Sequence, residues 1–485
     1  MIAPPLVTSA ATGLLEGAGI VVVLFFVVLH TATAAMLLSA LPELWRHWNV
    51  ADEPALASVL GSEALPTVSV VVTGRAEQEW TIENVRALLA LRYPRHEVVL
   101  VHDGAEHGFL AALIDTFDLY LVPPAVLVNV PTGAVRGYYR SQRNGKLFVI
   151  DKAFDGAADD LNAALNASRF PYILTMHVGT RLEPDALHGL MRPFLIGERP
   201  AAVAGTVRID ASDRAADDGS SATTASRWLA GVRTVERLRE SVFSRLGWNR
   251  FGGKLPSQGG VLLHRRDNLL EIDGFRGAAA DPEREVIERL RSHLRAQRLA
   301  DTVPTIPDAV AWGRPTASAR AIGRRRAAIH SGRLDELLAH RGTRAGPRGT
   351  RARLLVPLHL LAAAAAPIME LLGYLLLVVA LAIHGWRDPF VALFLVAVPG
   401  YALLLSLWAI ALEQARAPER ASGREALRLS RHAIAEQLGY RQWIMWHRLR
   451  ATWGAVTRAR RSEPERRAPL SSDAELSAPD RVRVR

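Results

Sequence analysis

The long uncharged stretch near the N-terminus is the strongest constraint on this chain, because it decides where the polypeptide can lie. It runs between Glu16 and Glu43 and contains ten consecutive apolar residues, Ile20–Leu29. A helix rises about 1.5 Å per residue, so this stretch exceeds the roughly 30 Å hydrocarbon core of a bilayer. The residues before Glu16 contain no Lys or Arg, whereas a secretory signal peptide begins with a basic region. We therefore predict an uncleaved transmembrane anchor at 16–44, with residues 1–15 outside the cytoplasm.

Two more apolar runs, Leu354–Ile383 and Pro389–Leu412, lie near the C-terminal end. In the first run, Pro357, Pro367 and Glu370 interrupt the apolar pattern. Proline removes a helix hydrogen bond and a charge is costly in hydrocarbon, so these residues favour two pieces over one straight helix. We predict an interfacial or membrane helix at 354–369, a transmembrane helix at 370–386 and another transmembrane helix at 389–412.

Arginine is concentrated on both sides of this predicted hairpin. These arginines are Arg344, Arg348, Arg351 and Arg353 before it, and Arg416, Arg420, Arg424 and Arg428 after it. Cytoplasmic flanks of membrane spans carry an excess of Lys and Arg. We therefore expect an integral protein of a bacterial-type cytoplasmic membrane, with its soluble domain in the cytoplasm. The flanking segments are a basic juxtamembrane segment at 316–353, a cytoplasmic helical tail at 413–461, and a disordered tail at 462–485, which has little apolar content.

The segment between the anchor and the hairpin alternates short β-branched runs with helical patterns, as is typical of α/β domains. Val68–Val72 and Val98–Val101 have the length of buried strands, and Thr81–Leu91 between them has apolar residues at helical spacing. This trio predicts a βαβ unit with a right-handed crossover. Further strands are expected at Phe148–Ile150, Tyr172–Thr175 and Val203–Ile209, with a helix at Asp159–Ser168. The predicted fold class is α/β, a Rossmann-like, mostly parallel sheet domain plus transmembrane helices.

The net charge of +11 and the absence of cysteine narrow the classes of function. Without cysteine there are no disulfides, thiolate zinc sites, iron–sulfur clusters or cysteine nucleophiles. A basic surplus can indicate nucleic-acid binding, but aromatic residues are not interleaved with these arginines as they are in nucleic-acid-binding modules. We therefore expect the membrane bilayer, and no nucleic acid, as a partner.

A set of ordered motifs resembles the family-2 glycosyltransferases. It begins with Leu65–Val72, Tyr93-Pro94, Glu97–Val101 and Asp103-Gly104. In that family this order gives a strand, a helix ending in a Tyr-Pro turn, and a second strand whose terminal aspartate contacts the nucleotide. The resemblance implies a GT-A fold at 65–315 and UDP or a UDP-sugar as ligand, with Asp103 accepting hydrogen bonds from uracil. Taken alone, Asp103 before Gly104 fits a simple turn equally well.

The resemblance continues to about residue 460. Further matches lie at Asp151-Lys152, Asp159, Leu161-Asn162, Glu183–Leu187, Ser257–Gly260, Arg265-Arg266 and Asp273–Phe275. Gly439–Gln442 and Trp453-Gly454 resemble the tail of membrane-bound members that make or extend β-linked polysaccharides. The resemblance implies that the substrates contact Glu77, Asp103, Asp151, Lys152, Asp159 and Gln258.

Several positions that perform the chemistry depart from the family pattern. Metal-assisted transfer needs an Asp-x-Asp turn, whose carboxylates hold Mg or Mn against the diphosphate. Here that turn reads His177-Val178-Gly179, in which Gly179 has no side chain and the His177 imidazole is a poor ligand for a hard cation, although it can bind Mn. The family's Gly-Gly-Lys is replaced by Asp155-Gly156-Ala157, which removes a cation and adds an anion beside the expected diphosphate. Mg or Mn with a UDP-sugar is therefore expected only if the protein is active.

The general base and the acceptor-side signature also differ. The family's Glu-Asp pair, whose aspartate is the general base, falls on Pro282-Glu283, with Asp281 as a neighbouring candidate. Glu283 also fits an ordinary acidic residue at a helix N-terminus. The Gln-x-x-Arg-Trp signature falls on Arg325–Ile329 and loses its tryptophan. Arg325 and Arg326 either grip phosphate or belong to a solvated juxtamembrane charge run.

These departures lead to three hypotheses. The one we favour is a degenerate glycosyltransferase that keeps the fold and acts as a membrane partner or scaffold for other proteins of polysaccharide or glycolipid assembly. The second is an active inverting transferase, in which histidine or arginine side chains replace the metal and Glu283 is the base. The third is a membrane sensor that binds UDP without turnover, because Asp103 and Glu77 are present.

Overall fold

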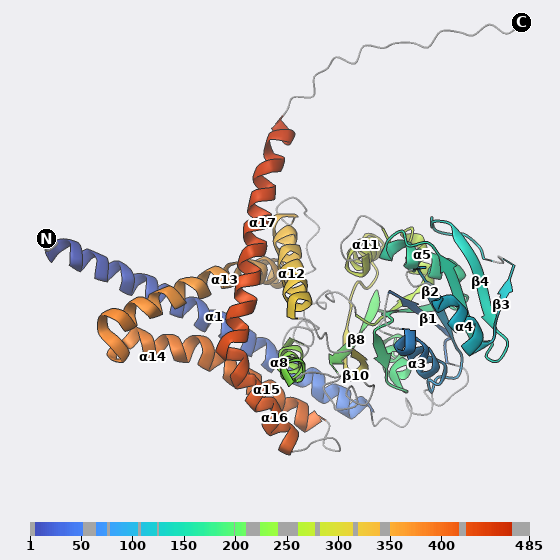
Figure 1. Cartoon of the computed structure of the whole chain (residues 1–485), viewed down its shortest axis with the longest axis horizontal. Helices are drawn as coiled ribbons and strands as arrows, with labels where there is room; N and C mark the ends of the chain where they lie inside the picture. Colours follow the sequence, from blue (N-terminus) through green and yellow to red (C-terminus); the bar gives the residue numbers. More distant parts are fainter. Residues whose placement is uncertain are drawn as a thin grey trace, which may run out of the picture.

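The computed structural model places an α/β sheet domain beside a group of long helices (Figure 1). The structure describes residues 5–51, 65–74, 78–104, 108–123, 126–197, 199–209, 224–240, 260–276, 282–313, 319–339, 350–416 and 423–467. The predicted α/β sheet and the predicted apolar helices are both present. Helix α8 Thr224–Arg239 comes from the middle of the chain, yet it packs with the long helices that follow the sheet domain.

The described strands form one ten-stranded sheet in the order β3-β4-β5-β2-β1-β6-β9-β8-β10-β7. They are β1 Val68–Thr73, β2 His96–His102, β3 Leu119–Val122, β4 Val135–Ser141, β5 Leu147–Lys152, β6 Tyr172–His177, β7 Thr180–Leu182, β8 Ala202–Ile209, β9 Leu262–Arg265 and β10 Thr305–Gly313. Parallel pairing joins β5, β2, β1 and β6 at the centre, and every run predicted as a strand lies in this sheet. The flanks add antiparallel pairs that were not predicted, because a short apolar run such as β9 carries no signal of its direction.

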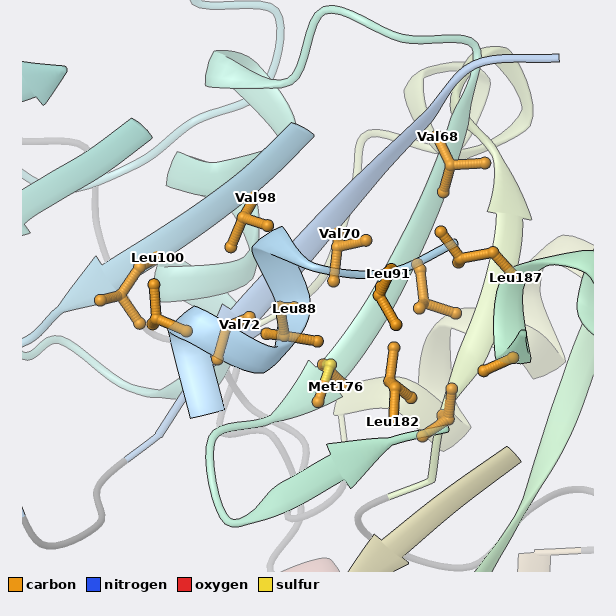
Figure 2. Close-up of a cluster of buried hydrophobic side chains, with 14 of the residues drawn as sticks. Val68, Val70, Val72, Leu88, Leu91, Val98, Leu100, Met176, Leu182 and Leu187 are labelled. Carbon is orange, nitrogen blue, oxygen red and sulfur yellow. The ribbon is translucent and has the colours of Figure 1, made fainter. Parts of the chain in front are cut away.

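Alternating side chains of the central strands enter two separate apolar clusters. Val68, Val70 and Val72 lie in one cluster, whereas Val71 lies in the other. Figure 2 shows the first cluster, in which these valines face Leu88 and neighbouring apolar side chains. The first cluster includes residues of α3 Gln78–Leu89, α4 Phe109–Phe117 and α6 Ala186–Leu195, and the second includes residues of α5 Ala157–Ala167 and α11 Pro282–Ala296. With both faces covered, the ends of the strands are left for ligands.

Three helices among the described residues are long and apolar enough to span a membrane, at Leu15–Ser39, Leu361–Arg387 and Pro389–Ala415. The first lies in α1 Pro5–Ala51 and the second in α13 Thr350–His384. The third comprises α14 Pro389–Leu395, a π-helical turn Val396–Gly400 and α15 Tyr401–Arg416. These helices support the predicted membrane association, while the side of the membrane on which the sheet domain lies stays a prediction.

Helix α13 corrects the expectation of two separate pieces at 354–369 and 370–386. It is one continuous helix that contains both Pro357 and Pro367. The expectation failed because the charge that argued for a break is neutralised within the protein. The Arg441 Nε lies 2.6 Å from Glu370 Oε1, and the ion pair lowers the cost of placing the carboxylate in an apolar helix.

Arg441 contacts all three spans. Besides Glu370 of α13, its Nη1 donates to the carbonyl of Val398 at 3.4 Å, and its guanidinium lies 5.9 Å from the centroid of the Phe26 ring. Val398 belongs to the π-helical turn, whose altered hydrogen bonding leaves carbonyls available to other donors. This arginine therefore fixes the relative positions of α1, α13 and the third span.

The predicted helical tail at 413–461 contains two helices, α16 Gly423–Ala435 and α17 Arg441–Arg467. A π-helical segment with non-helical backbone at Leu438 and Gly439 separates them and turns the chain toward Arg441. Helix α17 extends into the segment predicted as disordered, 462–485, of which residues 468–485 lie outside the described part of the chain.

We expect Glu370→Ala to destabilise the protein by about 3 kcal/mol, because it leaves the Arg441 guanidinium buried without its counter-charge. Thermal unfolding in detergent micelles measures the effect. The control variant Glu425→Ala breaks an exposed pair with Arg428, at 3.7 Å, and should change the unfolding temperature little. Replacing both Glu370 and Arg441 by leucine should recover most of the loss, and a double variant as unstable as the single one would contradict this account.

Candidate functional site

The strand order reverses between β1 and β6, and open α/β sheets bind ligands at such a point. From β1 the chain moves outward to β2 and β5, and then places β6 on the other side of β1. The carboxyl ends of these strands carry Thr73, Lys152 and His177, and Asp103 directly follows β2. Strand alternation places Thr73, Lys152 and His177 on the sheet face that α5 and α11 cover. We call this region the carboxyl edge.

Lys152 is the most deeply buried charged side chain of the carboxyl edge, with 0% of it exposed. Its Nζ donates to Asp160 Oδ1 at 3.1 Å and to the carbonyl of Ala153 at 2.8 Å, and it also pairs with Asp159. Burial disfavours the ammonium, but the hydrogen bonds and charges of Asp159 and Asp160 outweigh it and raise the pKa of Lys152. Burial also acts against the Asp159 carboxylate, yet Lys152 and the Gly133 N–H hold its pKa below the usual value. The Lys152 ammonium is therefore already paired with two carboxylates of its own chain.

Asp151 is held by Arg136 of β4. The Arg136 Nε donates to Asp151 Oδ2 at 3.0 Å, and its Nη2 donates to Asp151 Oδ1 at 2.7 Å and to the Lys152 carbonyl at 2.8 Å. The same guanidinium lies against Gly104, where a side chain would clash with it and where φ is +72°. Glycine is therefore required after Asp103.

Among the described residues of the carboxyl edge, carboxylates outnumber cations. The acidic residues are Asp103, Asp151, Asp155, Asp159 and Asp160, and the cations are Arg136 and Lys152. Burial raises the pKa of Asp160, and the negative charges of Asp103 and Asp159 add to that effect. The resulting negative potential disfavours the binding of an anionic ligand.

The turn that follows β6 lies directly at the reversal of strand order. The His177 imidazole covers Gly74 at the end of β1, where φ is +96° and an added side chain would clash with the ring. The His177 Nδ1 accepts a hydrogen bond from the Gly179 N–H at 3.1 Å. The turn therefore lies beside β1, and its imidazole covers the end of that strand.

Helix α3 holds the backbone of this turn. The Asn84 Nδ2 donates to the carbonyls of Val178, at 2.7 Å, and Thr180, at 2.9 Å, and the Trp80 Nε1 donates to Val178 at 3.1 Å. The Val178 N–H in turn donates to the carbonyl of Thr73 at 2.9 Å. A side chain at position 177 or 179 is thus presented on a firmly held backbone.

The described donors at the carboxyl edge do not fit a Mg or Mn site, because hard cations need several oxygen ligands. In the part of the chain that the structure describes, no three His, Asp or Glu side chains are grouped as metal ligands. At the turn, His177 uses Nδ1 for the Gly179 N–H, and Gly179 has no side chain. Asp151 and Asp159 are engaged by Arg136 and Lys152.

Glu283 lies beside β6 on the same face as His177. The Thr175 Oγ1 donates to Glu283 Oε1 at 3.2 Å, and Thr175 precedes His177 by two residues in the strand. Glu283 also stands in the first turn of α11, which begins at Pro282. Both interpretations of Glu283, as a base and as a helix N-terminal acid, are compatible with this position.

Among the remaining predicted residues, Arg326 lies apart from this group. Arg326 lies on α12 Ala319–Ala339 and pairs with Glu236 of α8. Glu77, Gln258 and Asp281 lie outside the described residues, as does the side chain of Arg325.

Three residues of the carboxyl edge were not found from the sequence. Asp160 had a signal, because it adjoins Asp159 in the first turn of a predicted helix. Asn84 also had one, since a polar residue on the apolar face of a helix indicates a buried hydrogen bond. Arg136 had none, because its partner Asp151 is brought to it only by the pairing of β4 with β5.

No protein-family model matches the chain, and no curated protein matches it significantly. Among solved structures, it is similar to a mannosyltransferase from Pyrobaculum calidifontis in complex with GDP-Man and Mn2+, with 15% identity and a TM-score of 0.47 over 86% of this chain and 99% of that chain. It is also similar to S. aureus TarS in complex with UDP-GlcNAc, with 12% identity and a TM-score of 0.35 over 78% of this chain and 92% of that chain. A third is glucosyl-3-phosphoglycerate synthase from Mycobacterium tuberculosis with Mn2+ and UDP, with 14% identity and a TM-score of 0.33 over 57% of this chain and 81% of that chain.

We expect Lys152→Met to destabilise the protein by about 3 kcal/mol at neutral pH, because Asp159 and Asp160 lose a buried counter-charge. The lowered pKa of Asp159 contributes stability that is present above its ordinary value of 3.8 and is lost as the pH falls through the folded value. In the variant, burial without a cation raises both carboxyl pKa values, so protonation relieves the repulsion at a higher pH.

The difference in unfolding temperature between parent and variant should therefore narrow from about pH 7 to about pH 4. Lys146→Met, at the start of the same strand, is the matched control and should show no such narrowing. A difference that stays constant with pH would contradict the assigned role of Lys152.

Proposed function

We propose that this chain is a membrane-anchored, family-2 glycosyltransferase-like protein that does not perform metal-assisted sugar transfer. In this proposal it acts as a partner or scaffold in polysaccharide or glycolipid assembly, with its sheet domain on the cytoplasmic side. The observation that carries the proposal is the carboxyl edge, where the buried Lys152 is neutralised by Asp159 and Asp160.

The charges of the carboxyl edge support the loss of transfer. A departing nucleoside diphosphate gains negative charge, which a metal ion or several cations must stabilise. Here Lys152 and Arg136 are both paired with aspartates, and the carboxylates are in excess. The residues present therefore stabilise the folded chain better than they would stabilise a leaving group.

A second buried ion pair supports the role of a membrane-held scaffold. Arg208 of β8 pairs with Glu413 of α15, and each side chain is only 14% exposed. The same guanidinium lies 5.7 Å from the centroid of the Trp312 ring in β10. Because α15 belongs to the third span, this pair holds the sheet against the membrane-spanning part of the chain.

An active inverting transferase is the second candidate, and the contact between Thr175 and Glu283 favours it. A base must stand within hydrogen-bond reach of the acceptor hydroxyl, and Glu283 lies beside the strand that ends in His177. If sugar transfer is detected, Glu283→Gln should lower kcat by about a hundredfold or more with a smaller change in KM. An unchanged kcat would exclude Glu283 as the base.

Calorimetric titration of UDP into the detergent-purified protein separates the candidates, when it is run with Mn and again with a chelator. The proposal expects no metal-dependent binding, because the donor set does not fit a metal. Metal-dependent binding would overturn the proposal and favour an active enzyme. Binding that is equal in both conditions would favour a UDP sensor, with Asp103 as the first residue to substitute.

Introducing the two carboxylates that the turn lacks tests the same proposal through a gain of metal-dependent binding. We expect the double variant His177→Asp, Gly179→Asp to acquire Mn-dependent UDP binding that the parent lacks. Position 179 can accept a side chain, because the nearest atom to an added Cβ is His177 Nδ1, at 3.3 Å, which the same variant removes. Gly145→Asp adds a carboxylate at an open position and is the control. Equal Mn dependence in parent and double variant would contradict the proposal.

A further inference from the structure

Helix α8 contains a buried arginine whose donors are not all paired. Arg233 is 5% exposed, and its Nε and Nη1 are buried with no hydrogen-bond acceptor in the part of the chain that the structure describes. Its neighbours explain the burial, because Val232 packs with residues of α12 and α17, whereas Val235 packs with residues of α15 and α16. Arginine stays protonated in proteins, so Arg233 is a buried cation with free donors.

The carboxylates near Arg233 already have partners. Glu236 pairs with Arg326 and accepts a hydrogen bond from the Tyr440 hydroxyl at 3.1 Å. Glu436 accepts from the Nη1 of Arg239 at 3.0 Å. Arg326, predicted to be either a phosphate ligand or a solvated residue, is therefore paired and largely buried near Arg233.

Other arginines lie near Arg233, and their positive charges oppose its own. Burial lowers its pKa, and the positive charges of Arg237 and Arg326 act in the same direction against Glu236 and Tyr440. A buried charge in this state is costly unless an anion joins it. The planar guanidinium matches the geometry of phosphate oxygens, so a phosphate group has the chemistry that fits.

The site lies where α8 meets the membrane-spanning helices. Arg239, further along α8, donates to the hydroxyl of Ser406 in the third span at 2.6 Å. Figure 1 shows α8 between the long helices and the sheet domain. Helices α16 and α17 and the segment between them expose a series of large apolar side chains, Leu427, Ile434, Leu438, Trp446 and Trp453. Exposed tryptophan and leucine on basic helices are typical of segments that lie in the membrane interface.

We propose that Arg233, flanked by Arg237 and Arg326, binds a phosphate group, and that the headgroup of an anionic lipid supplies it. The lipid source is favoured because the site adjoins a span and helices with an interfacial pattern. The same chemistry would accept a free phosphate, so the test separates the two sources.

The test is thermal unfolding of the detergent-purified full chain in the presence of dioctanoyl phosphatidic acid, dioctanoylglycerol or inorganic phosphate. A ligand that binds the folded state raises the unfolding temperature. We expect a concentration-dependent rise with phosphatidic acid and a smaller one with either of the other two. In Arg233→Gln, the apparent Kd for phosphatidic acid should increase about tenfold or more, because a charge-assisted hydrogen bond is lost.

Arg431→Gln is the matched control, because it removes an exposed arginine from α16 and changes the net charge equally. It should keep the affinity of the parent. Equal weakening in the two variants would indicate diffuse surface attraction and overturn the proposal, as would an unchanged affinity in Arg233→Gln or an equal rise with dioctanoylglycerol. A rise with inorganic phosphate that matches phosphatidic acid, and that Arg233→Gln removes, would support the site with a soluble source.

A second variant covers the case in which Arg233→Gln does not fold. Arg233→Lys keeps the positive charge but lacks the planar fork, so it should fold and bind phosphatidic acid more weakly than the parent. Parent-like affinity in Arg233→Lys would overturn the proposal.

Discussion

Ion pairs buried between elements are the constraint on which this architecture depends. A charge removed from water needs an opposite charge beside it, and several of these partners lie on elements far apart in the chain. Arg441 and Glu370 join α17 to α13, Arg208 and Glu413 join β8 to α15, and Arg326 and Glu236 join α12 to α8. Each ion pair joins two elements that no other of these pairs joins. Together they link the spans, the helices at the ends of the spans and the sheet.

The same principle governs the carboxyl edge of the sheet. Lys152 and Arg136 lie where a ligand of an open α/β sheet would bind, yet both form ion pairs with aspartates of their own chain. The turn after β6 is firmly held by Asn84, but it presents an imidazole and a glycine. At this position the described charged side chains form ion pairs that stabilise the protein. Arg233 shows the opposite arrangement, because its buried Nε and Nη1 have no acceptor among the described residues.

Local patterns predicted the elements well, and long-range contacts account for what they missed. Strands β1 and β2 and helix α3 followed from apolar spacing, because burial on one face leaves a period in the sequence. The break expected near Glu370 did not occur, because Arg441 neutralises this glutamate. The sequence could not predict this ion pair, since Arg441 lies 71 positions away and no local pattern links the two residues. The role of Arg136 was not predicted for the same reason, because only the pairing of β4 with β5 brings it to Asp151. The resemblance named Lys152 and His177 as site residues, but neither the burial of Lys152 nor the contact of His177 with Gly74 could be derived from motifs.

The sequence by itself determined that this chain has an apolar anchor, an α/β sheet domain and further apolar helices, because hydropathy and periodicity are properties of neighbouring residues. It also determined that carboxylates are missing from the turn at His177 and Gly179. Only the tertiary structure decided which cation meets which carboxylate, because such pairs form between elements that pack in space and not between neighbours in the chain. For that reason Lys152 and Arg326 proved to be paired and largely buried, while Arg233, which no motif marked, proved to be a buried cation with two donors unpaired among the described residues.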